Sequence, residues 1–283
     1  MSNAAKGAWW MIAAAGALTA MAICIRYLPT YSVLLMIFLR NVINLVLMTP
    51  SMVRQGKAIF RTERLGTHAI RNAFLYSGNV AWFFGVTKIS LADVAALQFT
   101  SPLFTAIIAA ALLGERLGGH RMVAILVGFA GALIIIRPGI IPLNIGTLSI
   151  LLAACLYSCA HVVTKLLSNT ESGSTVVFYM SVTILIYSAI PAAFVWQTPA
   201  LADMPAMIGL GITGYATHYC ITRSLAVGDA SFVIVFDFMR LPFSVALGWM
   251  LFTEVLDAWT AAGALIIFAT GYYSTVREAK KSG

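Results

Sequence analysis

An aspartate and an arginine stand three residues apart inside an otherwise apolar stretch of this chain. Asp237 and Arg240 interrupt segment 231–252, and a second arginine, Arg40, lies near the middle of the apolar segment 32–49. If these segments cross a lipid bilayer, each charge costs about 2.5–3.5 kcal/mol near the bilayer centre. Charges of this kind are retained where they face protein, water or a ligand. The three residues are therefore the first candidates for chemistry.

Two interpretations are open for each charged group. Asp237 and Arg240 share a helical face. In a cavity, Arg240 would bind a carboxylate or phosphate and Asp237 an amine or a coupling proton; alternatively, the two form an ion pair that fastens their helix to a neighbour. Arg40 and Asn44 also share a face, one turn apart. Arg40 would bind an anionic group through two hydrogen bonds, or instead extend to the membrane interface.

Polar and aromatic side chains at helical spacing form further stripes. They would stack on a planar ring and hydrogen-bond its edges in a wet cavity, or form interhelical hydrogen bonds worth about 0.6 kcal/mol each. An unperturbed histidine titrates near neutral pH, so each of the two histidines of this set either carries a proton or stays neutral and hydrogen-bonded. The predicted binding residues are Arg40, Asn44, Tyr76, Asn79, Trp82, Gln98, Tyr157, His161, Tyr215, His218, Asp237 and Arg240.

Apolar stretches of about membrane-spanning length must position these residues. Hydrophobic residues make up 60% of the chain and charged residues 10%, against about 25% charged in soluble domains. A bilayer-spanning helix needs about 20 apolar residues, and short Pro- or Gly-containing breaks separate the stretches. We predict ten spans, at 8–25, 32–49, 70–86, 94–113, 122–136, 146–164, 175–196, 206–222, 231–252 and 259–276.

The positive charges are distributed unevenly between the two expected faces. With the N-terminus inside, thirteen of the 18 Lys and Arg residues fall on the inner side, three fall outside and two lie within spans. This is the positive-inside pattern of an inner-membrane protein, and it places both termini in the cytoplasm. The net charge of +8 thus sets the topology and argues against a nucleic-acid partner.

The two halves of the chain resemble each other. Asp93 and Asp229 end similar polar crossings 136 residues apart (229 − 93), and Glu115 and Glu254 end similar apolar stretches 139 residues apart (254 − 115). Five spans per half is an odd number, so the second half would insert upside down. The fold prediction is an all-α polytopic membrane protein, with residues 1–141 and 142–283 as two inverted five-helix repeats around a central cavity.

The first half carries residues that resemble a known family. The run LADVAALQFTSPLF at 91–104, Gly114-Glu115, and a glycine-containing helix that ends at Arg137-Pro138-Gly139 resemble the EamA-type repeat of the drug/metabolite transporter superfamily. The resemblance covers nearly the whole chain. It implies ten helices, cytoplasmic termini, a central cavity and alternating access. The second half departs from the pattern, because Thr253-Glu254 replaces Gly-Glu and Pro242 is one position out of register.

The resemblance implies an inner-membrane secondary transporter of a small polar organic metabolite. The first half is most similar to members that take up S-adenosylmethionine or riboflavin; the alternative is export of amino acids or related metabolites such as metallophores. The chain has no G-x-x-x-x-G-K-[ST] phosphate loop, so a coupling proton or substrate exchange would drive transport. The substrate, its direction, and the choice between monomer and homodimer stay open.

Other functions lack their sequence signals. A membrane-embedded enzyme, the distant alternative, needs clustered acidic ligands or a catalytic histidine pair, whereas Asp237 is the single acidic residue within a predicted span. A channel would need a filter segment and a voltage sensor an arginine ladder. The four cysteines lie in apolar stretches without metal-ligand partners. We therefore expect no catalytic residue, no metal site, no disulfide and no cofactor.

Overall fold

The computed structural model describes residues 3–55, 62–113, 119–137, 144–168, 170–171, 173–227 and 233–282. All regular structure in these ranges is helical. The elements are α1 (Asn3–Arg26), α2 (Val33–Gln55), α3 (Leu65–Val86), α4 (Leu91–Gln98), α5 (Ser101–Leu113), α6 (Gly119–Ile136), α7 (Ile145–Ser168), α8 (Gly173–Phe194), α9 (Met204–Val227), η2 (Ile234–Met239), α11 (Arg240–Phe252) and α12 (Ala258–Ser282).

The helices have the length and surface of bilayer-spanning segments. Five stretches within the described ranges are long and apolar enough to cross a membrane, and two shorter apolar helices accompany them. Large apolar side chains also face outward: Ile190 and Leu265 are each 67% exposed and Phe194 is 85% exposed. A contiguous apolar exterior is unfavourable in water and favourable in lipid. The chain is a multi-pass membrane protein.

Two of the predicted spans are broken rather than continuous. The predicted span 94–113 forms α4 and α5 with a break at Phe99 and Thr100, and in the predicted span 231–252 a 3₁₀ segment, η2, precedes α11. Pro102 and Pro242 lie just after the two breaks. Each lacks a backbone N–H, and its ring clashes with the carbonyl four residues earlier, at Gln98 and Phe238. The helical path therefore changes at these points.

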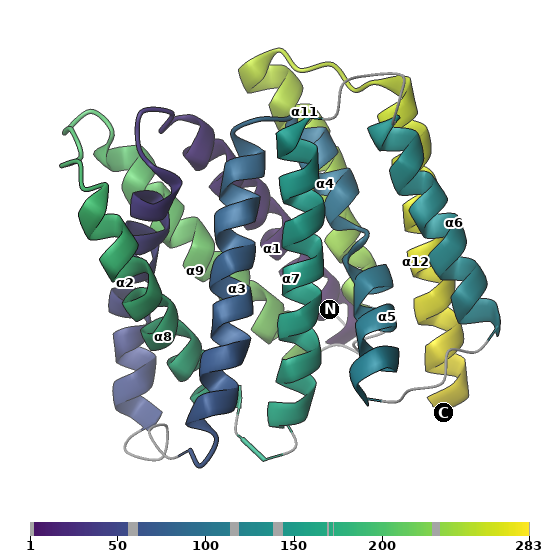
Figure 1. Cartoon of the computed structure of the whole chain (residues 1–283), viewed down its shortest axis with the longest axis horizontal. Helices are drawn as coiled ribbons and strands as arrows, with labels where there is room; N and C mark the ends of the chain where they lie inside the picture. The colour runs from purple at the N-terminus through teal and green to yellow at the C-terminus, as the bar shows by residue number, and fades with distance from the viewer. Residues whose placement is uncertain are drawn as a thin grey trace.

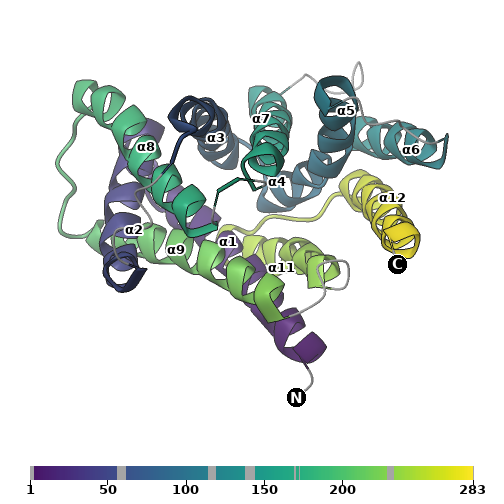
Figure 2. The same ribbon diagram turned by 90° about the horizontal axis from the view of Figure 1, so that it is seen from below.

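The helices pack side by side in pairs that are distant in sequence. α1 packs on α9, α3 on α7 and α6 on α12, while α2 packs on both α8 and α9. Figures 1 and 2 show α6 and α12 together at one side of the bundle, with α2 and α8 at the other. Both chain ends lie in the lower half of Figure 1, so the turns after α1, α3, α8 and α11 gather at the opposite, upper end.

The closely packed core is concentrated toward the upper end. Side chains with no exposed surface there include Ile25 and Leu28 near the end of α1, Leu35 at the start of α2, and Val86 at the end of α3. All four belong to one cluster of buried apolar residues. The upper end is therefore sealed by packed side chains.

Candidate functional site

A cavity of about 660 Å³ lies inside the bundle. Each described element except α12 contributes residues to its wall. The wall reaches Met11, Ile125 and Leu225, near the lower ends of α1, α6 and α9. Of the twelve residues predicted from sequence, ten line this cavity: Arg40, Asn44, Asn79, Trp82, Gln98, Tyr157, His161, His218, Asp237 and Arg240.

The other two predicted residues, Tyr76 and Tyr215, do not line the cavity. The Tyr76 hydroxyl is buried without a hydrogen-bond partner, and its ring lies 6.2 Å from that of Tyr187 on α8. Tyr215 stacks on Tyr219, with 6.0 Å between the ring centroids. Both residues instead lie among aromatic contacts between and along helices.

Arg40 enters the cavity wall from α2 and is 5% exposed. Its guanidinium lies 5.1 Å from the centroid of the Phe83 ring, and Nη1 lies 4.0 Å from the Met21 sulfur. Its aliphatic part packs against α9 at Gly214, where an added Cβ would lie 3.2 Å from Arg40 Cδ. The absence of a side chain at 214 thus lets α9 approach the arginine closely. The guanidinium faces the cavity and does not extend to a membrane interface.

Asp237 and Arg240 combine the two interpretations of their sequence spacing. They form an ion pair across the junction of η2 and α11, and both residues line the cavity. The guanidinium of Arg240 also lies 5.5 Å from the Phe99 ring centroid, and Phe99 contacts Phe238 at 4.6 Å between centroids. The two helix breaks therefore meet at a cluster of two aromatic rings and one arginine.

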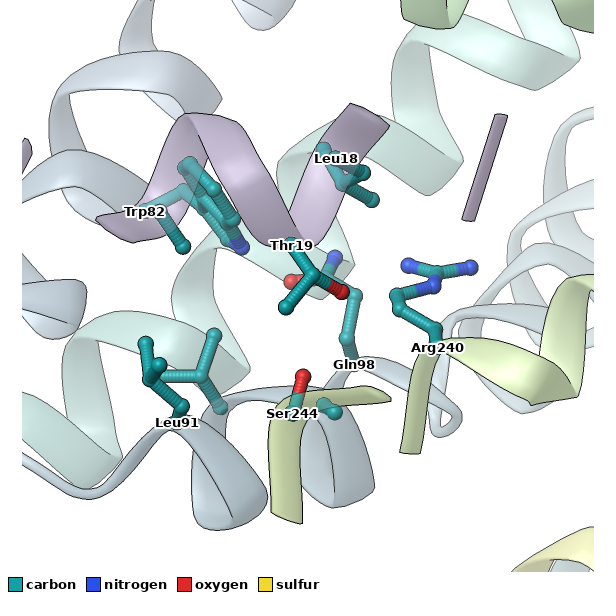
Figure 3. Close-up of a pocket in the computed structure, with 10 residues that line it drawn as sticks. Leu18, Thr19, Trp82, Leu91, Gln98, Arg240 and Ser244 are labelled. Carbon is teal, nitrogen blue, oxygen red and sulfur yellow. The ribbon is translucent and has the colours of Figure 1, made fainter. Parts of the chain in front are cut away.

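A much smaller pocket continues from the main cavity past Arg240. It has a volume of about 10 Å³ and shares Leu18, Trp82, Gln98 and Arg240 with the main wall. Figure 3 shows Thr19, Gln98 and Arg240 converging on it from α1, α4 and α11. Such a volume accommodates about one water molecule. The free space is therefore much narrower here than in the main cavity, and it ends at Leu91, toward the upper end.

The histidines and a tyrosine complete the polar wall. His161 and His218 are exposed residues that line the cavity, and neither imidazole has a hydrogen-bond partner in the described ranges. The Tyr157 hydroxyl donates to Asn79 Oδ1 at 3.0 Å, which joins α7 to α3. The wall thus offers aromatic faces together with donors and acceptors, a combination suited to a polar heterocyclic molecule.

Several polar atoms of the cavity residues have no partner within the described protein. They are Arg40 Nε, Asn44 Oδ1, Gln98 Oε1 and Arg240 Nε. Leaving a buried donor or acceptor unpaired costs about 1–3 kcal/mol. All four atoms belong to residues of the cavity wall. In contrast, the described residues include no group of three His, Cys, Asp or Glu side chains that could hold a metal ion.

Sequence reasoning missed some residues of the wall. Asn41 and Thr217 line the cavity although their side chains donate to helix backbone carbonyls, at 2.8 Å to Ile37 and 2.8 Å to Thr213. Arg71 is one of the thirteen basic residues predicted on the inner side, although it stands at the start of the predicted span 70–86. It is buried in α3 and donates to Thr164 at 2.7 Å and to Asn72 at 2.9 Å. Short polar residues on apolar helices give no strong sequence signal.

Comparisons with known proteins agree with this architecture. The model of the EamA-like transporter family matches residues 5–137 and again residues 144–275. A riboflavin transporter of Vibrio cholerae is 32% identical over 98% of this chain and 95% of its own length. A riboflavin transporter of Brucella anthropi is 31% identical, over 93% and 96%. An S-adenosylmethionine uptake transporter of Rickettsia bellii is 27% identical, over 86% and 84%.

One solved structure, described only as a crystal structure of a protein, shares the fold. It superposes with a TM-score of 0.66 at 17% identity and covers 96% of this chain and 98% of that chain. The fold therefore agrees over nearly the full length, and the family model covers both halves. This chain belongs to the EamA-like transporter family.

Proposed function

We propose that this protein is an inner-membrane secondary transporter that takes up a small polar heterocyclic metabolite by alternating access. The observation that carries the proposal is the central cavity, whose buried polar atoms on Arg40, Asn44, Gln98 and Arg240 lack protein partners. Relatives that match nearly the whole chain are riboflavin transporters, and others are S-adenosylmethionine uptake transporters. Cargo related to these two heterocyclic molecules is the class to test first.

Two inverted repeats, residues 1–141 and 142–283, are part of the proposal. The family model matches once in each half. In the proposed repeats, α1 corresponds to α7 and α3 corresponds to α9. The packing follows this correspondence, since α1 packs on α9 and α7 packs on α3. Gln98 and Asp237, which line the cavity close to the two breaks, are 139 residues apart (237 − 98), the same offset as Glu115 and Glu254. Discontinuous helices that meet at the repeat interface are typical binding sites of secondary transporters.

The described conformation fits a cavity that opens toward the lower end. The wall reaches Met11 and Leu225 near that end, whereas Ile25, Leu28 and Val86 are fully buried at the other. The lower end carries both termini and most of the basic loops, so we assign it to the cytoplasm. The conformation is then inward-facing. Uptake would require a second conformation in which the upper end opens and the lower end closes.

Export is the second candidate function. It is supported by a pseudopaline exporter of Pseudomonas aeruginosa, which is 28% identical over 82% of this chain and 82% of its own length. The cavity itself is compatible with either direction, because alternating access is reversible and the driving gradient sets the net flow. Direction is therefore decided by transport measurements.

The test is uptake into proteoliposomes reconstituted with the purified full-length chain. The panel contains radiolabelled riboflavin, S-adenosylmethionine and representative amino acids, with protein-free liposomes as control. Saturable uptake of a heterocycle, together with exchange against the same unlabelled compound, supports the proposal. Uptake equal to that of empty liposomes for every compound would contradict it. Preferential efflux from loaded liposomes under an imposed gradient would favour the exporter.

A further inference from the structure

Arg40 is a buried cation whose described neighbours include no anion. The Met21 sulfur, the Phe83 ring and the backbone of α9 at Gly214 surround it, and Nε has no partner. In the ranges that the structure describes, no carboxylate forms an ion pair with this guanidinium. A ring face and a thioether stabilise a cation only weakly. The positive charge of Arg40 therefore lacks a counter-charge among the described residues, and an anionic group in the cavity would supply one.

The two other arginines nearby have oxygen partners, which Arg40 lacks in the described ranges. Arg240 is paired with Asp237. Arg71 lies outside the cavity wall and donates to Thr164 and Asn72. Among the described lining residues, Arg40 and Arg240 face a single carboxylate, Asp237. With neutral histidines, the described wall therefore has one uncompensated positive charge, and it is located at Arg40.

The surroundings of Arg40 define the rest of a recognition site. Asn44, one turn along the same face, and Gln98 on α4 also line the wall, and their amides both donate and accept hydrogen bonds. The amides suit the N–H and carbonyl groups of a ring, while the Trp82 and Tyr157 rings offer flat surfaces on the same wall. The complementary molecule has a planar ring system, N–H donors and one negatively charged group.

We propose that Arg40 anchors an anionic group, a carboxylate or a phosphate, of the transported molecule. A guanidinium binds either group through two parallel charge-assisted hydrogen bonds. This proposal rests on the proposed transport function. It restricts the expected cargo to heterocyclic metabolites that carry an anionic group. A neutral heterocycle of the same shape would leave the Arg40 charge buried and unpaired, and it would bind more weakly for that reason.

Isothermal titration calorimetry on the purified full-length protein tests the anchor with two matched pairs. S-adenosylmethionine and its decarboxylated analogue differ by a carboxylate; flavin mononucleotide and riboflavin differ by a phosphate. We expect the member that carries the anionic group to bind about 10- to 100-fold tighter than its partner without that group, as expected for charge-assisted hydrogen bonds in a desolvated site. Which pair shows the difference identifies the anionic group as carboxylate or phosphate.

Variants separate this anchor from a structural role of Arg40. Arg40→Gln should remove the preference for the member with the anionic group, while Arg40→Lys should keep part of it because the charge remains. Arg71→Gln, which changes a buried arginine outside the cavity wall, should leave the preference intact. Equal affinity within both pairs, equal loss for both members in Arg40→Gln, or no binding of any of the four compounds would overturn the anchor. Uptake of a neutral heterocycle into proteoliposomes would still support the proposed transport function.

Discussion

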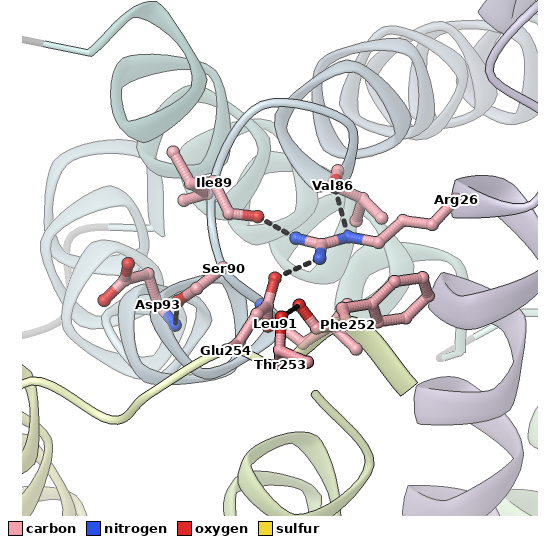
Figure 4. Close-up of polar contacts among 9 residues, drawn as sticks. All are labelled: Arg26, Val86, Ile89, Ser90, Leu91, Asp93, Phe252, Thr253 and Glu254. Carbon is pink, nitrogen blue, oxygen red and sulfur yellow. Dashed lines mark hydrogen bonds and ion pairs between the residues drawn. The ribbon is translucent and has the colours of Figure 1, made fainter. Parts of the chain in front are cut away.

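Arg26 at the end of α1 forms an ion pair with Glu254, a residue 228 positions further along the chain. Figure 4 shows that the same arginine also donates to the carbonyls of Val86 and Ile89, while Glu254 accepts from the Leu91 N–H at 2.9 Å. One pair of charges thus ties α1, the α3–α4 turn and the end of α11 together. It lies at the sealed end, beyond the small pocket beside Arg240.

This arrangement predicts that Glu254→Gln loosens the upper end. The pair is only partly exposed, with side-chain exposures of 13% and 18%, so its loss leaves a poorly solvated arginine behind. The reporter is Ser244→Cys, in the wall of the small pocket, in a chain whose native cysteines are replaced by serine. Labelling by a membrane-impermeant thiol reagent added at the upper side should accelerate about 5- to 10-fold.

The matched control is Arg137→Gln, which breaks a more exposed pair with Asp257 at the same end. Exposed pairs contribute about 0–1 kcal/mol. The labelling rate in this variant should therefore stay close to that of the Ser244→Cys protein in which both ion pairs are intact. If Glu254→Gln and Arg137→Gln label at the same rate, the Arg26–Glu254 pair is not what keeps the upper end closed.

The contact between α6 and α12 gives a prediction for stability. A Cβ at Gly263 would lie 2.5 Å from the Gly131 carbonyl oxygen, and one at Gly131 would lie 2.9 Å from the Gly263 oxygen. Small residues allow helix backbones to approach this closely in membranes. Gly263→Val should destabilise the fold by about 1–3 kcal/mol, seen as a lower thermal unfolding midpoint in detergent. Gly66→Ala, with no atom within 4 Å of the added Cβ, is the control, and an equal midpoint for both variants would refute the contact.

The two broken helices predict that removing their prolines affects the rate of transport but does not lower the stability of the fold. Pro102→Ala and Pro242→Ala restore a backbone N–H near each break, so α4–α5 and η2–α11 should become more continuous. We expect uptake to slow several-fold while the unfolding midpoint stays the same or rises. Pro191→Ala provides the control, because α8 continues through Pro191 without a break. Unchanged uptake in both break variants would mean that the breaks are not hinges.

The cavity histidines predict a response to a proton gradient. His161 and His218 line the cavity wall without described hydrogen-bond partners, and an imidazole can take up a proton on one ring nitrogen and release it again. We expect an inward-directed proton gradient to accelerate uptake in proteoliposomes. The double variant His161→Gln with His218→Gln should remove the acceleration and keep exchange of substrate at equal pH. Acceleration that persists in the double variant would exclude these histidines as proton carriers.

Much of the fold could be predicted from sequence because the lengths of the apolar runs are dictated by the bilayer. The breaks were harder to predict. Hydrophobicity at 94–113 is continuous, so the run alone predicts one helix, and only the backbone chemistry of Pro102 explains the interruption after Gln98. The Arg26–Glu254 pair could not be predicted either, because nothing local relates residues so distant in sequence.

The site was partly predictable for a similar physical reason. Charged and amide side chains within apolar helices, such as Arg40 and Gln98, have few favourable places except an internal cavity. Tyrosines are amphipathic and pack equally well against other rings, as Tyr76 does against Tyr187 on another helix and Tyr215 against Tyr219 on its own helix. Helical spacing shows which residues share a face, whereas the rotation of each helix about its axis depends on packing against its neighbours.

The proposed transport function places the cargo beside the Asp237–Arg240 ion pair, because both residues line the central cavity. Its most direct test is the rate of proteoliposome uptake of the identified cargo by Asp237→Asn, compared with Asp257→Asn, which alters a carboxylate remote from the cavity. We predict a loss of about tenfold or more for Asp237→Asn, since it removes the carboxylate that would bind an amine of the cargo or a coupling proton, and near-normal uptake for Asp257→Asn. Wild-type uptake by Asp237→Asn, in protein that is correctly folded and inserted, would contradict the account.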